Sequence, residues 1–280
     1  MKPPEHGVAG RWKGQLTRRA LPCEDPSIER LTRDERRRAA AIWLHRAAME
    51  RRVADSFEHI EAALRRRGAS ASLVALAHRA IDDEYRHAEL SRVVASCYAG
   101  CELAAPPRLE LELPRHRGAS PELRDSLFIV GQCVLNETTA GAFLEVCLSH
   151  ARGALATRAL RELLSDEIDH GRIGWAYLAS LDRRTRERVS TWLLPMAFLN
   201  LRQWRRESPD DPRHSLALAE HGAPPAHVIH AALLDALETL ILPGLAELGM
   251  SNAALESWLA QGADTEQPPT ELMSEPPFRT

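Results

Sequence analysis

The strongest constraint on this chain is a short motif that occurs twice, Asp-Glu-x-x-His. The copies are Asp83-Glu84-Tyr85-Arg86-His87 and Asp166-Glu167-Ile168-Asp169-His170. On a helix, residues three positions apart share a face, so the glutamate and histidine of one copy can bind the same metal ion. A single copy would carry little weight in a chain with 12 histidines. Two copies, each with the preceding aspartate, indicate a metal site built by two helices.

Capping residues and helix breakers place both motifs in the second arms of two predicted helical hairpins. Thr32 and Glu35 form a capping box before the first helix. Gly68 and Gly153 mark the two hairpin turns. Prolines within residues 101–118 predict an extended crossover between the hairpins. The four predicted helices cover about residues 33–67, 72–98, 120–151 and 154–181.

Each hairpin also carries a glutamate in its first arm, at a height that matches the motif glutamate. Antiparallel helices joined by a tight turn place residues at equal distances from the turn at equal height. Counted from Gly68, the two glutamates lie 18 residues before and 16 after; counted from Gly153, they lie 16 before and 14 after. Glu58 is the competitor on the first helix, and its height matches less well. The predicted set is Glu50, Glu84, Glu137 and Glu167.

The paired hairpins and motifs resemble the non-haem di-iron carboxylate proteins of the ferritin-like superfamily, which include di-iron oxidases and oxygenases and uncharacterised ferritin-like domain proteins. The resemblance covers residues 33–181. It implies an all-α fold, a ferritin-like four-helix bundle of two hairpins and a long crossover, with additional C-terminal helices. The catalytic metal ligands that it implies are terminal Glu50 and Glu137, bridging Glu84 and Glu167, and the nitrogen ligands His87 and His170.

The same resemblance implies an outer role for the aspartates that precede the motif glutamates. Asp83 is expected to pair with His170, and Asp166 with His87, which would orient the two imidazoles. Four buried carboxylates would repel one another without cations between them, and two divalent ions balance their charge. Mixed carboxylate and imidazole ligands favour two iron ions, with manganese or a mixed manganese and iron pair as the alternative.

The implied activity is an oxygen-activating oxidase or oxygenase that acts on a small organic substrate with dioxygen. Its electrons would come from an external donor, because no flavin or iron–sulfur motif occurs. The alternatives are a ferroxidase, a rubrerythrin-like peroxidase or a manganese catalase, and, more remotely, a metal-free scaffold. Aminoarene N-oxygenases carry a further histidine where this chain has Leu163, and hydrocarbon monooxygenases carry a threonine where it has Gly141. Neither narrower subfamily is therefore assigned.

Four segments are expected along the chain. They are an irregular N-terminal arm over residues 1–32, the metal-binding bundle over 33–181, a C-terminal helical extension packed on the bundle over 182–262, and a disordered tail over 263–280. Small residues near the ligands, among them Ala47 and Ala140, favour a substrate cavity and close helix packing equally. Trp43 and Tyr177 are expected to fill the core, as are Cys97 and Cys101.

Composition excludes several classes of protein. The formal net charge of -3 argues against a nucleic-acid partner. Five cysteines without paired spacing predict reduced thiols and no rubredoxin domain. The first residues contain no signal peptide, and charges are expected to interrupt every apolar run before it could span a bilayer, which predicts a cytoplasmic protein without a membrane partner. A homodimer is compatible with these features.

Overall fold

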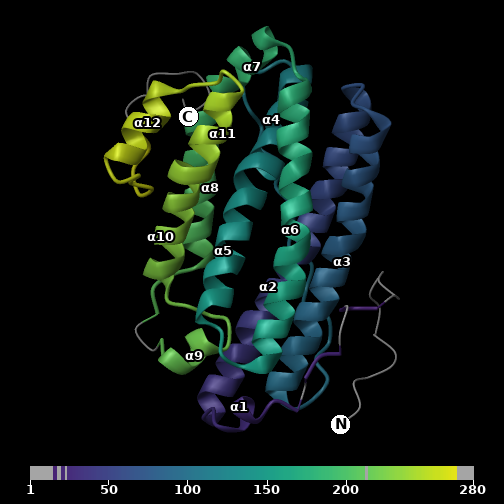
Figure 1. Ribbon diagram of the computed structural model, residues 1–280, viewed down its shortest axis with the longest axis vertical. Coiled ribbons are helices and arrows are strands. Elements are labelled where there is room, and N and C mark those ends of the chain that lie inside the picture. Colours follow the sequence, from purple (N-terminus) through teal and green to yellow (C-terminus); the bar gives the residue numbers. More distant parts are fainter. Residues whose placement is uncertain (1–14, 18–19, 23, 212–213, 270–280) are drawn as a thin grey trace.

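The computed structural model describes residues 15–17, 20–22, 24–211 and 214–269 (Figure 1). Within those ranges the chain is helical and contains no strand, which confirms the predicted all-α class. Four long helical segments carry the motifs and their hairpin partners. They are α2 (Arg33–Arg66), α3 (Ala71–Ala99), the continuous run of α4 (Pro121–Val130), η1 (Gly131–Asn136) and α5 (Glu137–His150), and α6 (Ala154–Ser180).

These four segments run lengthwise through the molecule (Figure 1). α2 packs along α3, and α5 packs against α6. The two hairpins also meet, because α3 contacts α6 and α4 contacts both α2 and α6. The two motif helices, α3 and α6, therefore lie directly against each other.

The helix ends follow the predicted capping chemistry. The Thr32 hydroxyl accepts a hydrogen bond from the Glu35 N–H at 3.2 Å, and the Glu35 carboxylate accepts one from the Thr32 N–H at 3.0 Å. This reciprocal pair is the predicted capping box of α2. α3 ends at Gly100, whose φ of 72° is the left-handed conformation that glycine adopts without strain. Ser120 caps α4 by accepting from the Leu123 N–H at 3.3 Å.

The third long segment differs from the regular α-helix predicted for it. It changes to a π-helix over Gly131–Asn136, immediately before Glu137. This part of the chain lies unusually close to α6, because a Cβ added at Gly174 would come within 2.7 Å of the Cys133 carbonyl carbon. Single π turns inside α-helices occur often at functional sites. Here the π turn resets the rotation of the helix just before a predicted ligand.

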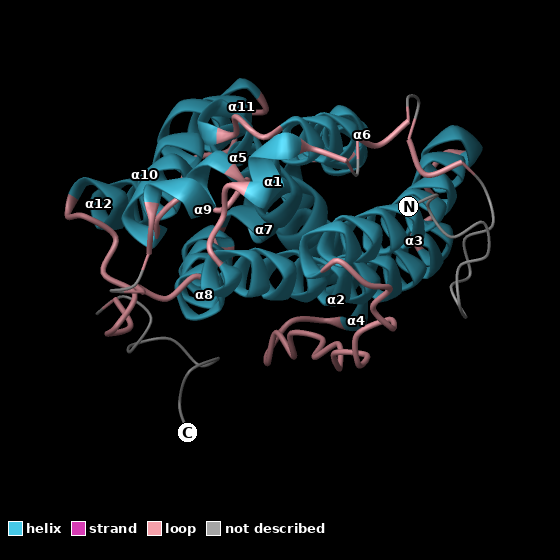
Figure 2. Cartoon of the chain, turned by 90° about the horizontal axis from the view of Figure 1, so that it is seen from below, coloured by secondary structure: helices cyan, strands magenta, loops and turns pink. Residues whose placement is uncertain are grey.

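The C-terminal third adds a layer of shorter helices on one side. Figure 2 shows α8, α10 and α12 on the side of the molecule opposite α2 and α3. α10 packs against α5 and α8, and α9 contacts α2 and α5. One buried hydrophobic cluster joins residues of the long helices, such as Leu127, to Phe198 and Leu255. The helices of this region are α7 (Arg183–Ser190), α8 (Leu193–Glu207), α9 (Leu216–Glu220), α10 (Ala226–Ala236), η2 (Leu237–Ile241), α11 (Leu242–Glu247) and α12 (Ala253–Ala260).

The N-terminal arm is more ordered near its end than the sequence predicts. It contains the short helix α1 (Pro26–Glu29), capped by Asp25. The second carboxylate oxygen of Asp25 accepts a hydrogen bond from the Leu155 N–H at 2.9 Å, which fastens the arm to the start of α6. Residues 1–14, 18–19 and 23 of the predicted arm and residues 270–280 of the predicted tail lie outside the described residues.

Two helical stretches are long and apolar enough to cross a membrane by length and composition alone. They are Pro121–His150 and Ala226–Glu247. The prediction that charges interrupt every apolar run is therefore wrong for these two. Core helices of folded proteins pass the same test, and half of the apolar window in the first stretch is buried inside the molecule. These stretches are weak indicators of a membrane.

Candidate metal centre

The six predicted ligand residues come from the four long segments and meet in the interior. They form two groups, and within each group one ligand atom per residue lies within 4.8 Å of all the others. Five of the side chains are buried, and Glu50 is partly buried. Glu84 and Glu167 belong to both groups. The first group is Glu50, Glu84, His87 and Glu167, and the second is Glu84, Glu137, Glu167 and His170.

Both histidines turn the same ring nitrogen toward the carboxylates. His87 Nδ1 lies 3.6 Å from Glu84 Oε2 and 3.8 Å from Glu167 Oε1. His170 Nδ1 lies 2.9 Å from Glu84 Oε1 and 3.5 Å from Glu167 Oε2. The two rings are tilted by 42° with centroids 5.9 Å apart. The imidazoles therefore flank the shared pair of glutamates symmetrically.

The other ring nitrogens face the two aspartates, each across the helix pair. His87 Nε2 is hydrogen-bonded to Asp166 at 3.1 Å. His170 Nε2 lies 3.8 Å from Asp83, which is longer than a hydrogen bond. The crossed partners are those expected from the sequence, with one contact tighter than the other. An aspartate in this position fixes the ring orientation and leaves Nδ1 available as a ligand.

Arg86 is a further member of this outer layer that the sequence analysis did not single out. Its guanidinium donates to Asp166, and to Asp83 at 3.4 Å, so one cation serves both aspartates. Its other terminal nitrogen donates to the Leu16 carbonyl at 3.0 Å. Arg86 lies at a variable position of the first motif, where the second motif has Asp169. The asymmetry between the two copies was the only signal for it.

Ligand-type atoms at the centre of the cluster lack hydrogen-bond partners among the described residues. These buried atoms are both carboxylate oxygens of Glu84, Oε2 of Glu167, and Nδ1 of His87 and His170. Buried polar atoms without partners are costly, so their concentration in one place requires a reason. A cation between them would satisfy all five. The donor set therefore fits a metal ion, and the cluster can hold one.

The glutamates differ in their electrostatic surroundings. Burial raises the pKa of Glu50 and Glu137 well above the usual carboxyl range, and the charges of the shared glutamates add to the effect. Burial also opposes ionisation of Glu84, but the nearby imidazoles of His170 and His87 outweigh it and lower the pKa of Glu84 to about 2. Protons on some carboxyls therefore relieve the repulsion when no cation is bound.

The histidines show the opposite behaviour. Burial disfavours the charged imidazole of His87, but Asp166 and Glu84 outweigh it and raise the pKa of His87 to about 10. Burial likewise opposes the charge on His170, yet Asp83 and Glu167 raise its pKa well above the usual value. The site attracts positive charge strongly. Because ligand atoms must be deprotonated, a metal ion would replace these protons.

The π turn supplies a contact that the sequence analysis missed. Gln132 Nε2 donates to Glu137 Oε1 at 2.6 Å, across a separation of five residues. A π-helix brings residues five apart onto the same face, whereas an α-helix brings residues four apart together. Gln132 therefore orients Glu137 through a backbone feature that side-chain patterns do not reveal.

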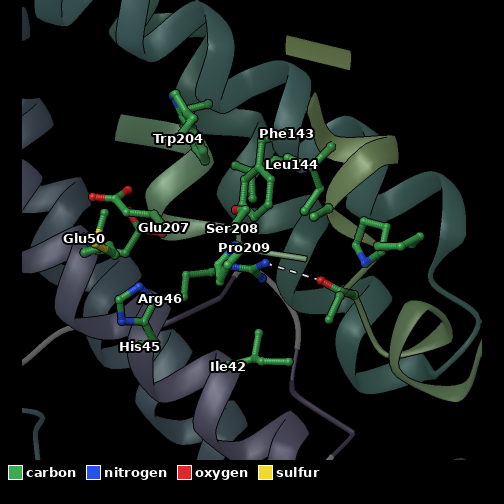
Figure 3. A pocket seen from close by; sticks show the side chains of 18 of the residues that line it. Ile42, His45, Arg46, Glu50, Phe143, Leu144, Trp204, Glu207, Ser208 and Pro209 are labelled. Atoms are coloured by element: carbon green, nitrogen blue, oxygen red, sulfur yellow. Dashed lines mark hydrogen bonds between the residues drawn. The ribbon is translucent and has the colours of Figure 1, made fainter. Parts of the chain in front are cut away.

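A cavity of about 900 Å³ adjoins the cluster. All four predicted glutamate ligands line it. Its other walls include Met49 of α2, Phe143 of α5 and Trp204 of α8 (Figure 3). The region after α8 also contributes, up to Ile229 in α10. The C-terminal helices, to which the sequence analysis gave no role, thus form part of the wall beside the metal centre.

The remaining candidates belong to the packing. Trp43 is fully buried and donates to the His221 carbonyl at 3.2 Å, and Tyr177 is buried with its hydroxyl 2.8 Å from Ser126 Oγ. Ala47 is buried, whereas Ala140 lines the cavity, so the small residues serve both suggested purposes. The four cysteines among the described residues, Cys97, Cys101, Cys133 and Cys147, form no disulfide, and Cys23 lies outside the described part.

Comparison of the chain with protein-family models, with curated proteins and with solved structures gave no match. Function is therefore inferred from the residues of the site and from the cavity beside them.

Proposed function

We propose that this protein is a ferritin-like di-iron enzyme, an oxidase or oxygenase that uses dioxygen to oxidise a small organic substrate. The observation that carries the proposal is the pair of overlapping ligand groups with two glutamates in common. Two metal ions with two shared carboxylates are the arrangement of the ferritin-like carboxylate proteins. The metal is proposed to be iron, with manganese or a mixed pair as the alternative.

Each ligand residue has a distinct task in this proposal. Glu84 and Glu167 would hold both ions at a fixed separation, because each belongs to both groups. Glu50 and Glu137 would each bind one ion from the side that borders the cavity. Asp166 accepts the Nε2 proton of His87 and so keeps Nδ1 free to bind metal. Two iron(II) ions, when bound, supply electrons for the reduction of dioxygen.

The cavity favours an organic substrate over the alternatives that handle iron or peroxide alone. Pockets for small molecules measure about 300–1,000 Å³. The cavity here, at about 900 Å³, is far larger than dioxygen or hydrogen peroxide requires. Its apolar lining, which includes Phe143 and Trp204, suits an organic body beside the metal ions. A ferroxidase, a rubrerythrin-like peroxidase and a manganese catalase need no such space.

Metal analysis followed by rapid mixing tests the proposal. Purified protein is analysed for iron and manganese, loaded anaerobically with iron(II), and mixed with oxygenated buffer in a stopped-flow spectrometer. Oxygen-dependent oxidation of bound iron, faster in the presence of an organic substrate and sustained by an external reductant, is the expected result. Rapid dismutation of hydrogen peroxide by manganese-loaded protein, or deposition of an iron mineral, would assign one of the alternatives instead.

A further inference from the structure

Arg46 is a buried arginine that lines the cavity with part of its hydrogen-bonding capacity unused. Its side chain is 7% exposed. Nη2 donates to the Gly222 carbonyl at 3.3 Å and contacts Cys147 Sγ at 3.8 Å. Nη1, the other terminal nitrogen, has no hydrogen-bond partner among the described residues. A buried donor without a partner is unfavourable, and a donor that carries charge is more so.

Two aromatic rings hold the Arg46 guanidinium in place. Its central carbon lies 4.2 Å from the centroid of the Trp43 ring and 5.2 Å from that of the Phe143 ring. Figure 3 shows Arg46 and Phe143 at the same cavity, with Glu50 on the same helix as Arg46. Cation–π contacts of this kind restrict the guanidinium without supplying a negative charge. The unused donor is therefore presented in a fixed position.

The other cavity arginines have acidic partners, and Arg46 does not. Arg38 forms an ion pair with Asp211, and Arg52 pairs with Glu207 at 2.9 Å. No ion pair of Arg46 occurs within the described part of the chain. A bound anion would give Arg46 both the missing counter-charge and the missing acceptor.

We propose that Arg46 binds the carboxylate of the substrate, which is an organic acid with an apolar body that extends toward the metal centre. The inference rests on the proposed function and names its substrate class. Arg46 precedes Glu50 by four residues, which is one helical turn or about 6 Å along α2. A carboxylate at Nη1 would therefore leave a carbon several bonds away beside Glu50 and Glu137. The apolar lining along this path includes Phe143 and Leu144.

A monocarboxylate fits better than a more highly charged group. Nη2 is already occupied by Gly222, so Arg46 offers one free terminal nitrogen to the cavity. One charge-assisted hydrogen bond suits a singly charged carboxylate, whereas a phosphate dianion would need several cations to leave water. Arg38 and Arg52 are engaged by their own carboxylates and do not provide them.

Calorimetric titration with matched acids and amides tests the proposal. The protein is loaded anaerobically with iron(II) and titrated with straight-chain acids from butanoate to decanoate and with the corresponding amides. At least one acid should bind about tenfold or more tightly than its amide, the size expected for a charge-assisted hydrogen bond. Arg46→Gln should remove the preference, and Arg46→Lys should restore part of it. Arg38→Gln is the control and should retain the preference.

Two outcomes would overturn the proposal. One is that no acid binds more tightly than its amide. The other is that the preference survives in Arg46→Gln, which would place the carboxylate on the metal ions themselves. Metal content and thermal unfolding of each variant establish that it is folded and loaded, and the comparison of acid with amide in the unaltered protein needs no variant. Because calorimetry requires no oxygen chemistry, acid binding and oxidation of iron by oxygen can succeed or fail independently.

Discussion

At the scale of single residues, the shared and unshared glutamates should differ in what their loss removes. Glu84 belongs to both ligand groups, whereas Glu50 belongs to one. Glu84→Ala should therefore abolish most metal binding, while Glu50→Ala should retain about half of the two ions expected per chain. Elemental analysis after anaerobic loading and dialysis measures the stoichiometry. Glu58→Ala, on the same helix, is the control, and a loss there as large as in Glu84→Ala would argue against the assignment.

The residues of the site were predictable where their spacing is repeated. The second copy of the motif, and the equal heights of Glu50 and Glu137, pointed to six side chains that the structure brings together. Arg46 had no comparable signal. It stands in a run of alanines and charged residues, where an arginine ordinarily faces solvent. Its burial depends on Trp43 and Phe143, and the latter lies about a hundred residues further along the chain.

At the scale of elements, the close contact between η1 and α6 depends on a glycine. A Cβ at Gly174 would lie 2.7 Å from Cys133 backbone and from Val134, so neither helix can avoid it by moving one flexible side chain. Gly174→Ala should destabilise the protein by about 1–3 kcal/mol, the usual cost of overpacking, and should lower metal occupancy by displacing Glu137. Urea denaturation and metal analysis measure the two effects.

Gly141→Ala provides the matched control for this substitution. Nothing lies within 4 Å of a Cβ at Gly141, which is also helical. Alanine there should be neutral or stabilising by up to about 1 kcal/mol, because alanine favours the helix. Equal effects of the two substitutions would show that the η1–α6 contact does not constrain the site.

The helices were easier to predict than their irregularities. Caps at Thr32 and Ser120 satisfy backbone groups locally, so a few neighbouring letters identify the helix start. The π turn before Glu137 depends on the surface of α6, far away in sequence, and its residues have no local preference that separates π from α geometry. Gly171 and Gly174, directly after the second motif, were the visible sign that another backbone approaches there.

The crossover contains a histidine that should make folding stability depend on pH. Burial lowers the pKa of His116 to about 4, and Arg124 adds to the effect. The ring packs edge-on against Trp192 at 5.5 Å. The unfolded chain takes up this proton near pH 6.5, above the folded pKa, so the folded state loses stability as pH falls from about 6.5 to about 4.

Replacing His116 tests this linkage. His116→Gln should lose less stability than the unaltered protein between pH 7.5 and pH 4.5, by on the order of 1 kcal/mol, because partial exposure screens the charge. Urea denaturation at the two pH values gives the free energies of unfolding. Parallel losses in both proteins would mean that the ring takes up a proton without leaving its place against Trp192.

At the scale of the whole molecule, the C-terminal helices are continuous with the core that carries the site. Phe198 and Leu233 belong to the same buried cluster as Leu127 and Val130 of α4. Trp204 lines the cavity beside the glutamates. The boundary predicted near residue 181 coincides with the end of α6 at Ser180, but the hydrophobic packing crosses it. Helix periodicity locates such ends without showing which apolar faces meet, because packing partners are distant in sequence.

A chain that ends at residue 181 should therefore fail to fold cooperatively. Burying one large apolar side chain contributes about 1.5–3 kcal/mol, and a domain has only about 5–15 kcal/mol of net stability. Removing α8 and α10 exposes several such side chains at once, among them Leu127 and Leu193's partners in the buried cluster. Loss of a sharp thermal transition in circular dichroism is the expected result. A chain that ends at residue 269 should unfold like the full protein, whereas a sharp transition and full metal binding in the shorter chain would show that residues 33–181 fold alone and that the later helices serve only the cavity.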